Sequence, residues 1–93
     1  MLEMILKIRG KVQRVGFRYG VLEFVQSTQL PVHGYVQNLP DGSVEILAQG
    51  EIEDLKALHR FATKGPPHAE VREVDEDLKP ITKLTKQNFV IID

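Results

Sequence analysis

The sequence predicts an α+β fold, a two-layer α/β sandwich in which two helices cover one face of an antiparallel sheet. Three observations predict it: segments with a period of two, two segments with helical spacing, and glycines or prolines between them. The 93 residues are 42% hydrophobic and 27% charged. These values fit a single globular domain over residues 1–93 with one modest core.

The N-terminal half predicts a strand, a helix and a hairpin. Met4, Leu6 and Ile8 alternate with other residues, which predicts a first strand over about residues 2–9. Apolar residues then recur at helical intervals from position 17, and Pro31 ends that helix near position 30. Residues 32–38 and 43–49 read as two strands. The Leu-Pro-Asp-Gly turn at 39–42 joins them.

The C-terminal half predicts a helix and two strands. Acidic residues open the helix at about residue 51, and Lys-Gly-Pro-Pro at 64–67 ends it. In the strand over 69–78, Val71 stands at an odd position and Val74 at an even one, so a regular strand would point them to opposite faces of the sheet. This indicates a bulge or bend. Residues 89–92 form a short extra C-terminal strand. The order βαββαβ plus this strand is ferredoxin-like, a fold with many unrelated functions, so a site must decide the function.

Composition narrows the function classes. The chain has no cysteine, and no apolar run long enough to span a membrane. Its formal net charge of −1 argues against a broad nucleic-acid surface, so a bound anion needs a local site. We therefore expect a cytoplasmic monomer that binds neither membrane nor nucleic acid.

The loop over residues 10–18 is the candidate anion site. It leads from the first strand into the first helix, where unpaired backbone amides and the helix dipole favour a bound phosphate. Gly10 and Gly16 let the backbone approach a ligand, and Arg18 can add a bidentate, charge-assisted contact. The alternative is that the glycines only turn the chain and Arg18 is a solvated surface residue.

A second segment, residues 34–45, makes the functional interpretation of the loop more specific. It reads Gly-Tyr-Val-Gln-Asn-Leu-Pro-Asp-Gly-Ser-Val-Glu. With the loop it resembles the acylphosphatase family, whose two motifs are approximately G-x-V-Q-G-V-G-F-R and G-x-V-x-N-x-x-D-G-x-V-E. Gly65-Pro66-Pro67 and the last strand are also similar to that family. The resemblance implies a metal-independent hydrolase without a cofactor, which converts acyl phosphates to carboxylate and inorganic phosphate, the latter a product and inhibitor.

The resemblance also implies roles for single residues. Arg18 would hold the phosphoryl group and Asn38 would orient the attacking water. The first two strands of a βαβ unit run parallel, so both residues are expected at one edge of the sheet. The backbone amides of five residues would form the phosphate cradle: Gln13, Arg14, Val15, Gly16 and Phe17.

Arg14 departs from the family pattern, because it stands where a glycine is usual. If its φ is positive, its Cβ costs about 1 kcal/mol. The alternative function is therefore a catalytically weak or inactive phosphate- or carboxylate-binding module of the same fold. An RNA-binding ferredoxin-like domain would stack bases on Tyr19 and Tyr35, but the third strand has no aromatic residue. The three histidines show no metal-ligand spacing: His33, His59 and His68.

Overall fold

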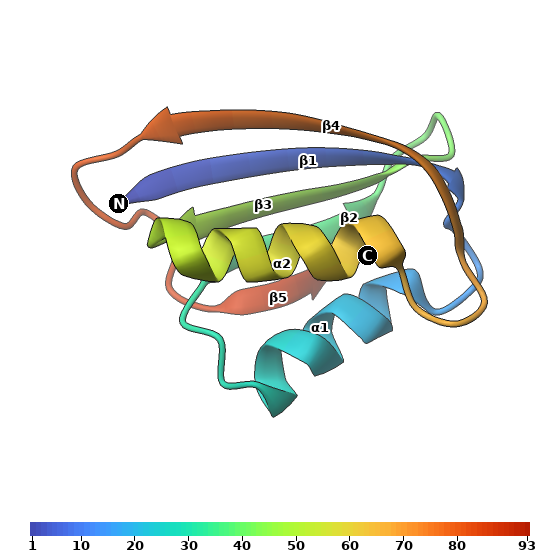
Figure 1. Cartoon of the computed structure of the whole chain (residues 1–93), viewed down its shortest axis with the longest axis horizontal. Helices are drawn as coiled ribbons and strands as arrows, with labels where there is room; N and C mark the ends of the chain where they lie inside the picture. Colours follow the sequence, from blue (N-terminus) through green and yellow to red (C-terminus); the bar gives the residue numbers. More distant parts are fainter.

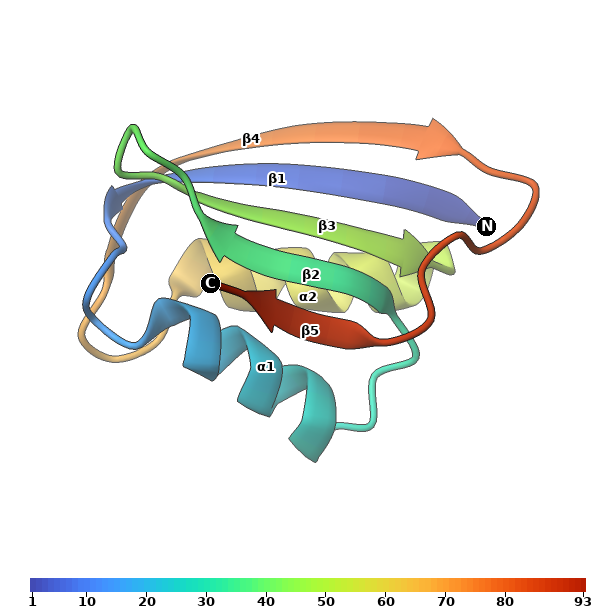
Figure 2. The same cartoon turned by 180° about the vertical axis from the view of Figure 1, so that it is seen from behind.

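The computed structural model describes all residues, 1–93, and contains the predicted elements in the predicted order. They are β1 (Leu2–Lys11), α1 (Phe17–Ser27), β2 (His33–Asn38), β3 (Val44–Gly50), α2 (Ile52–Lys64), β4 (Glu70–Pro80) and β5 (Phe89–Ile92). The strands form one sheet in the order β4-β1-β3-β2-β5. In Figure 1 α2 lies in front of this sheet and α1 below it, and in Figure 2 α2 lies behind the sheet. The predicted two-layer α+β sandwich is confirmed.

The direction of the last strand makes the sheet mixed rather than wholly antiparallel. β4, β1, β3 and β2 pair antiparallel in turn, whereas β5 pairs parallel to β2. The connection over residues 81–88 turns the chain back after β4 and carries it to the other edge. Because β4 is antiparallel to β2, a strand that reverses β4 has to run parallel to β2.

The core lies between the sheet and the helices. β1 buries Met4, Leu6 and Ile8, the predicted alternate positions, and each fully buried aliphatic side chain contributes about 1.5–3 kcal/mol. The buried helical side chains are Phe17, Val21 and Val25 of α1 and Leu55, Leu58 and Ala62 of α2. Phe24 and Phe61 stack at 4.5 Å between ring centroids, which joins the two helices. Neither helix is long and apolar enough to cross a membrane.

Helix α1 ends at Ser27, three residues before the predicted end at Leu30. Gln29 takes a left-handed φ of 50°. The Leu30 amide donates to the Val25 carbonyl at 2.9 Å, and the Gln29 amide to the Gln26 carbonyl at 3.2 Å. These two bonds form a Schellman motif, so the helix is closed by its own last turn and not by the following proline.

A bulge interrupts the pairing of β1 with β4, as the valine parities predicted. The register shifts between Arg9 and Gly10, which leaves Arg72 of β4 without a partner residue. Val71 and Val74 can then both pack against the core. A Cβ on Gly10, whose φ is 137°, would lie 2.1 Å from a carbonyl oxygen of β4. Glycine is therefore required where the two strands approach at the bulge.

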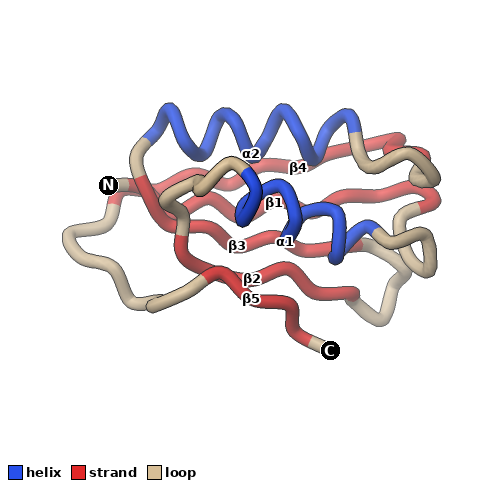
Figure 3. Tube along the Cα trace, turned by 90° about the horizontal axis from the view of Figure 1, so that it is seen from below, coloured by secondary structure: helices blue, strands red, loops and turns tan.

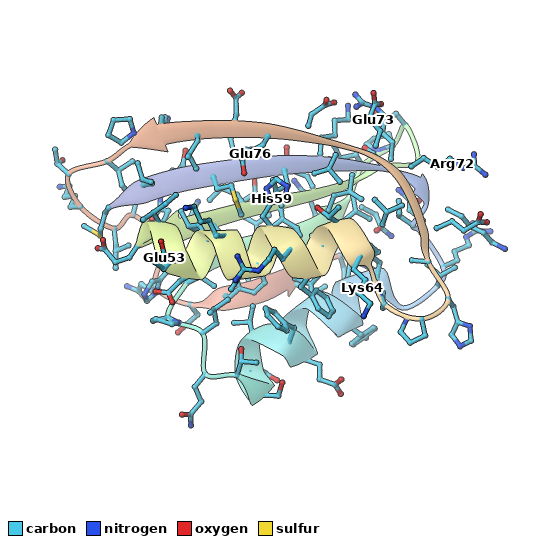
Figure 4. All side chains as sticks on the ribbon, in the orientation of Figure 1. Glu53, His59, Lys64, Arg72, Glu73 and Glu76 are labelled. Carbon is cyan, nitrogen blue, oxygen red and sulfur yellow. The ribbon has the colours of Figure 1, made fainter.

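Two of the histidines have structural contacts. In Figure 4 His59 of α2 lies beside Glu76 of β4, and its Nδ1 hydrogen-bonds that carboxylate. His33 Nδ1 contacts the carbonyl oxygen of Gln87 at 2.8 Å. These contacts link α2 to the edge strand and β2 to the segment that precedes β5.

Candidate active site

The predicted site residues meet at one end of the sheet. The β1–α1 loop and the β2–β3 hairpin both lie at this end in Figures 1 and 3. Arg18 and Asn38, twenty positions apart, line the same cavity of about 160 Å³. The other lining residues are Val12, Arg14, Gly16, Phe17 and Tyr19. The topology thus brings the two residues together as expected from parallel β1 and β2.

The loop before α1 presents free backbone donors. None of the amides of Gln13, Arg14, Val15 and Gly16 donates a hydrogen bond to a protein acceptor. Gly16 has a φ of 76° at the N-cap, and no side chain caps the helix. Arg14 has a φ of 64°. The condition stated above for strain at this position, a positive φ, is therefore met. Successive amides in such a turn, followed by a helix N-terminus, form a concave site for an anion.

The side chain of Gln13 fixes this loop to the neighbouring hairpin. Its Nε2 donates to the carbonyl oxygens of Leu39 at 2.8 Å and Ser43 at 2.9 Å. The hairpin follows directly after Asn38, so these bonds set the distance between the loop and Asn38. From the sequence, only the backbone amide of Gln13 is expected in the site, and no local pattern marks its side chain as a bridge.

Asn38 offers an acceptor with no partner in the protein. Its Oδ1 atom is buried and accepts no hydrogen bond. A buried polar atom without a partner is rare, because its desolvation costs about 1–3 kcal/mol. The residue lies at the end of β2 and lines the cavity. A donor group of a ligand, or a water molecule, at the cavity wall would satisfy this atom.

Arg18 is held by the C-terminal strand. Its Nη1 donates to the carbonyl oxygen of Ile92 at 3.1 Å and to Asp93 Oδ1 at 3.2 Å. The Arg18 side chain is 25% exposed, whereas that of Asp93 is 96% exposed. A carboxylate this exposed is a weak partner, which an incoming anion can displace. β5 was predicted as a strand, but its contact with Arg18 was not.

The aspartate of the second motif serves the hairpin. Asp41 Oδ2 lies 2.8 Å from Lys7 Nζ, and its Oδ1 accepts from the Ser43 amide at 3.0 Å. The Lys7 hydrogen bond, followed by those from Ser43, holds the pKa of Asp41 well below its usual range. It therefore stays charged as a turn residue. No acidic side chain lines the cavity itself, which suits an anionic ligand.

Comparisons with known proteins agree with this geometry. The acylphosphatase family model matches residues 4–91. An acylphosphatase of Thermococcus kodakarensis is 46% identical over 70 residues, 75% of each chain. One of Thermoplasma volcanium is 38% identical over 86 residues, 92% of this chain and 91% of the other. The crystal structure of acylphosphatase from Bacillus subtilis has a TM-score of 0.90 and 30% identity, with 100% of both chains covered.

Proposed function

The chain belongs to the acylphosphatase family, and we propose that the cavity between Arg18 and Asn38 is where it hydrolyses acyl phosphates. The enzyme is an acylphosphatase, which cleaves the carboxyl–phosphate bond of a small-molecule substrate. The alternative of an inactive binding module is not favoured by these relationships. The observation that carries the assignment of the site is the unpartnered, buried Asn38 Oδ1 in a cavity that also holds Arg18 and free loop amides.

The phosphoryl group binds to the loop and Arg18. The free amides of residues 13–16 and the first turn of α1 donate to its oxygens. Arg18 releases the exposed Asp93 carboxylate and turns its charge toward the phosphate, while the Ile92 carbonyl keeps the guanidinium in place. These donors stabilise the charge on the equatorial oxygens, the main requirement of phosphoryl transfer.

Asn38 positions the nucleophile. A water molecule donates one hydrogen bond to Asn38 Oδ1, which aims a lone pair at phosphorus. The water oxygen forms the new P–O bond as the bond to the acyl oxygen breaks, and the electron pair leaves with the carboxylate. The water proton passes to the phosphate oxygens. A carboxylate is a good leaving group, so the reaction requires no strong general acid. A neutral amide orients the water without repelling the dianion, as an aspartate would.

The proposed mechanism is metal-independent, because amide dipoles and one guanidinium neutralise the phosphoryl charge. We also propose that the protein acts as a cytoplasmic monomer without nucleic acid; its formal net charge of −1 argues against a broad basic surface for a polyanion. Hydrolysis of benzoyl phosphate should be unaffected by a chelator. Activity lost on chelation and regained with a divalent cation would contradict the mechanism. Elution at the mass of a dimer would contradict the monomer.

Two substitutions test the roles of the site residues. Arg18→Ala should abolish both turnover of benzoyl phosphate and inhibition by inorganic phosphate. Asn38→Ala should lower kcat by roughly two decades or more and leave phosphate inhibition nearly unchanged, because its partner is water. Arg72→Ala and Asn88→Ala, exposed residues outside the cavity, are the matched controls and should behave as wild type. Equal loss of phosphate inhibition in both site variants would show that the roles are wrongly divided.

A further inference from the structure

Arg14 is a cation of the cavity that the proposed hydrolysis does not use. It lines the cavity in which the acyl phosphate is proposed to bind, and its side chain is exposed. It takes part in none of the eight ion pairs of the structure: these use Met1, Lys7, Arg9, Arg18, Lys56, His59 and Lys79 as their positive partners. Of the two arginines that line the cavity, Arg14 is thus the one without an ion pair.

Only the amide of Arg14 is assigned to the phosphate cradle, so its guanidinium has no role in the proposed hydrolysis. Its φ of 64° is a conformation that a side chain disfavours by about 1 kcal/mol. The backbone conformation therefore does not explain an arginine at this position. Tyr19, which is 71% exposed, lines the same cavity and adds an apolar surface at its rim. An acyl group bound in this cavity would meet these two side chains.

We propose that Arg14 is a specificity residue that favours acyl phosphates whose acyl group carries a second negative charge, such as the monoacyl phosphates of dicarboxylic acids. This inference rests on the proposed acylphosphatase site. No acidic side chain lines the cavity, and Arg18, the other cation of its lining, is paired with Asp93. The acyl carboxylate would therefore meet Arg14 as the cation of the lining without an ion pair.

Succinyl phosphate and butyryl phosphate make a matched pair, because they share a four-carbon chain and differ in one carboxylate. For charges about 7 Å apart in water, Coulomb attraction gives about a threefold preference in kcat/KM. The ratio of the two kcat/KM values should approach one at 1 M salt, where the Debye length is about 3 Å. Arg14→Gln should lose the preference and Arg14→Lys should keep it. Lys11→Gln, which removes a charge at the end of β1, outside the cavity lining, should keep most of it.

The ratio separates this inference from the proposed function. If neither substrate is turned over, the site assignment has failed; competition between 3-phosphonopropionate and propylphosphonate for binding then tests Arg14 by itself. A wild-type ratio near one, or a ratio that Arg14→Gln leaves unchanged, would overturn the inference. The salt dependence of the wild-type ratio gives the same answer if a variant fails to fold. If Lys11→Gln lost the preference for succinyl phosphate to the same extent, the preference would come from the overall positive charge around the site and not from Arg14.

Discussion

The left-handed φ of Arg14 predicts that glycine at this position relieves strain. At 64° the Cβ opposes the conformation by about 1 kcal/mol, and a glycine would remove that cost. Glycine also gains entropy in the unfolded chain, which offsets about half or more of the effect. Arg14→Gly should therefore raise the free energy of unfolding by at most about 0.5 kcal/mol. For a domain of this size the midpoint would rise by at most about 2–4 °C.

A second residue provides the control. Gln29 has a φ of 50° in the Schellman motif at the end of α1 and does not line the cavity. Gln29→Gly should raise the midpoint by a similar amount and leave phosphate inhibition unchanged. In Arg14→Gly the relaxed cradle should also improve phosphate affinity and turnover of benzoyl phosphate, by at most about fivefold for 1 kcal/mol.

The assays are thermal unfolding and kcat/KM for benzoyl phosphate at low and high salt. High salt screens the attraction between Arg14 and the substrate dianion, so that a difference in kcat/KM at high salt reports only the relief of strain. A variant that is slower only at low salt would show that electrostatic attraction outweighs strain for this substrate. A midpoint that falls in Arg14→Gly while it rises in Gln29→Gly would refute the premise that position 14 is strained.

Two further predictions concern the C-terminal strand and the open face of the sheet. Asp93→Asn should strengthen inhibition by inorganic phosphate about twofold at low salt, because the carboxylate competes for Arg18 through an exposed ion pair; no change would mean that this pair does not compete. Burial, and next the hydrogen bond to Glu45, raises the pKa of Tyr35 to about 12 from 10.0. The folded state thus holds the phenol proton more tightly, so its contribution is complete below pH 10 and is lost as pH rises toward 12. Tyr35→Phe should flatten the decline of the thermal midpoint over this interval, and an unchanged slope would contradict the shift.

Local patterns in the sequence predicted most of the fold. The period of two in β1 identified its buried residues, and the parity of Val71 and Val74 predicted the bulge opposite Gly10. Two features depend on tertiary context. The end of α1 depends on Gln29 accepting a left-handed φ, for which glycine is the usual signal. The direction of β5 depends on which edge of the sheet the segment 81–88 reaches, and periodicity carries no information about that.

For the candidate site too, some features could be predicted from the sequence and others could not. The positions of Arg18 and Asn38 follow from the parallel order of β1 and β2, so the sequence predicted that they meet. The bridge from Gln13 to the hairpin spans 26 and 30 positions, and the bond from Arg18 to Ile92 spans 74. Such bonds between distant residues have no local sequence pattern. They are visible only when the hairpin, the loop and β5 are placed together.

The sheet order also separates charge within the chain. The edge strand β4 carries five acidic residues: Glu70, Glu73, Asp75, Glu76 and Asp77. Arg18 contacts β5 at the opposite edge, and two arginines but no acid line the cavity. The charged side chains that line the cavity are therefore all positive, although the formal net charge of the chain is −1. Because Coulomb attraction decays over a Debye length of about 10 Å at 0.1 M salt, a dianion in the cavity responds to the nearby arginines more than to β4. Phosphate affinity should thus weaken with salt, the opposite of what the net charge alone would give.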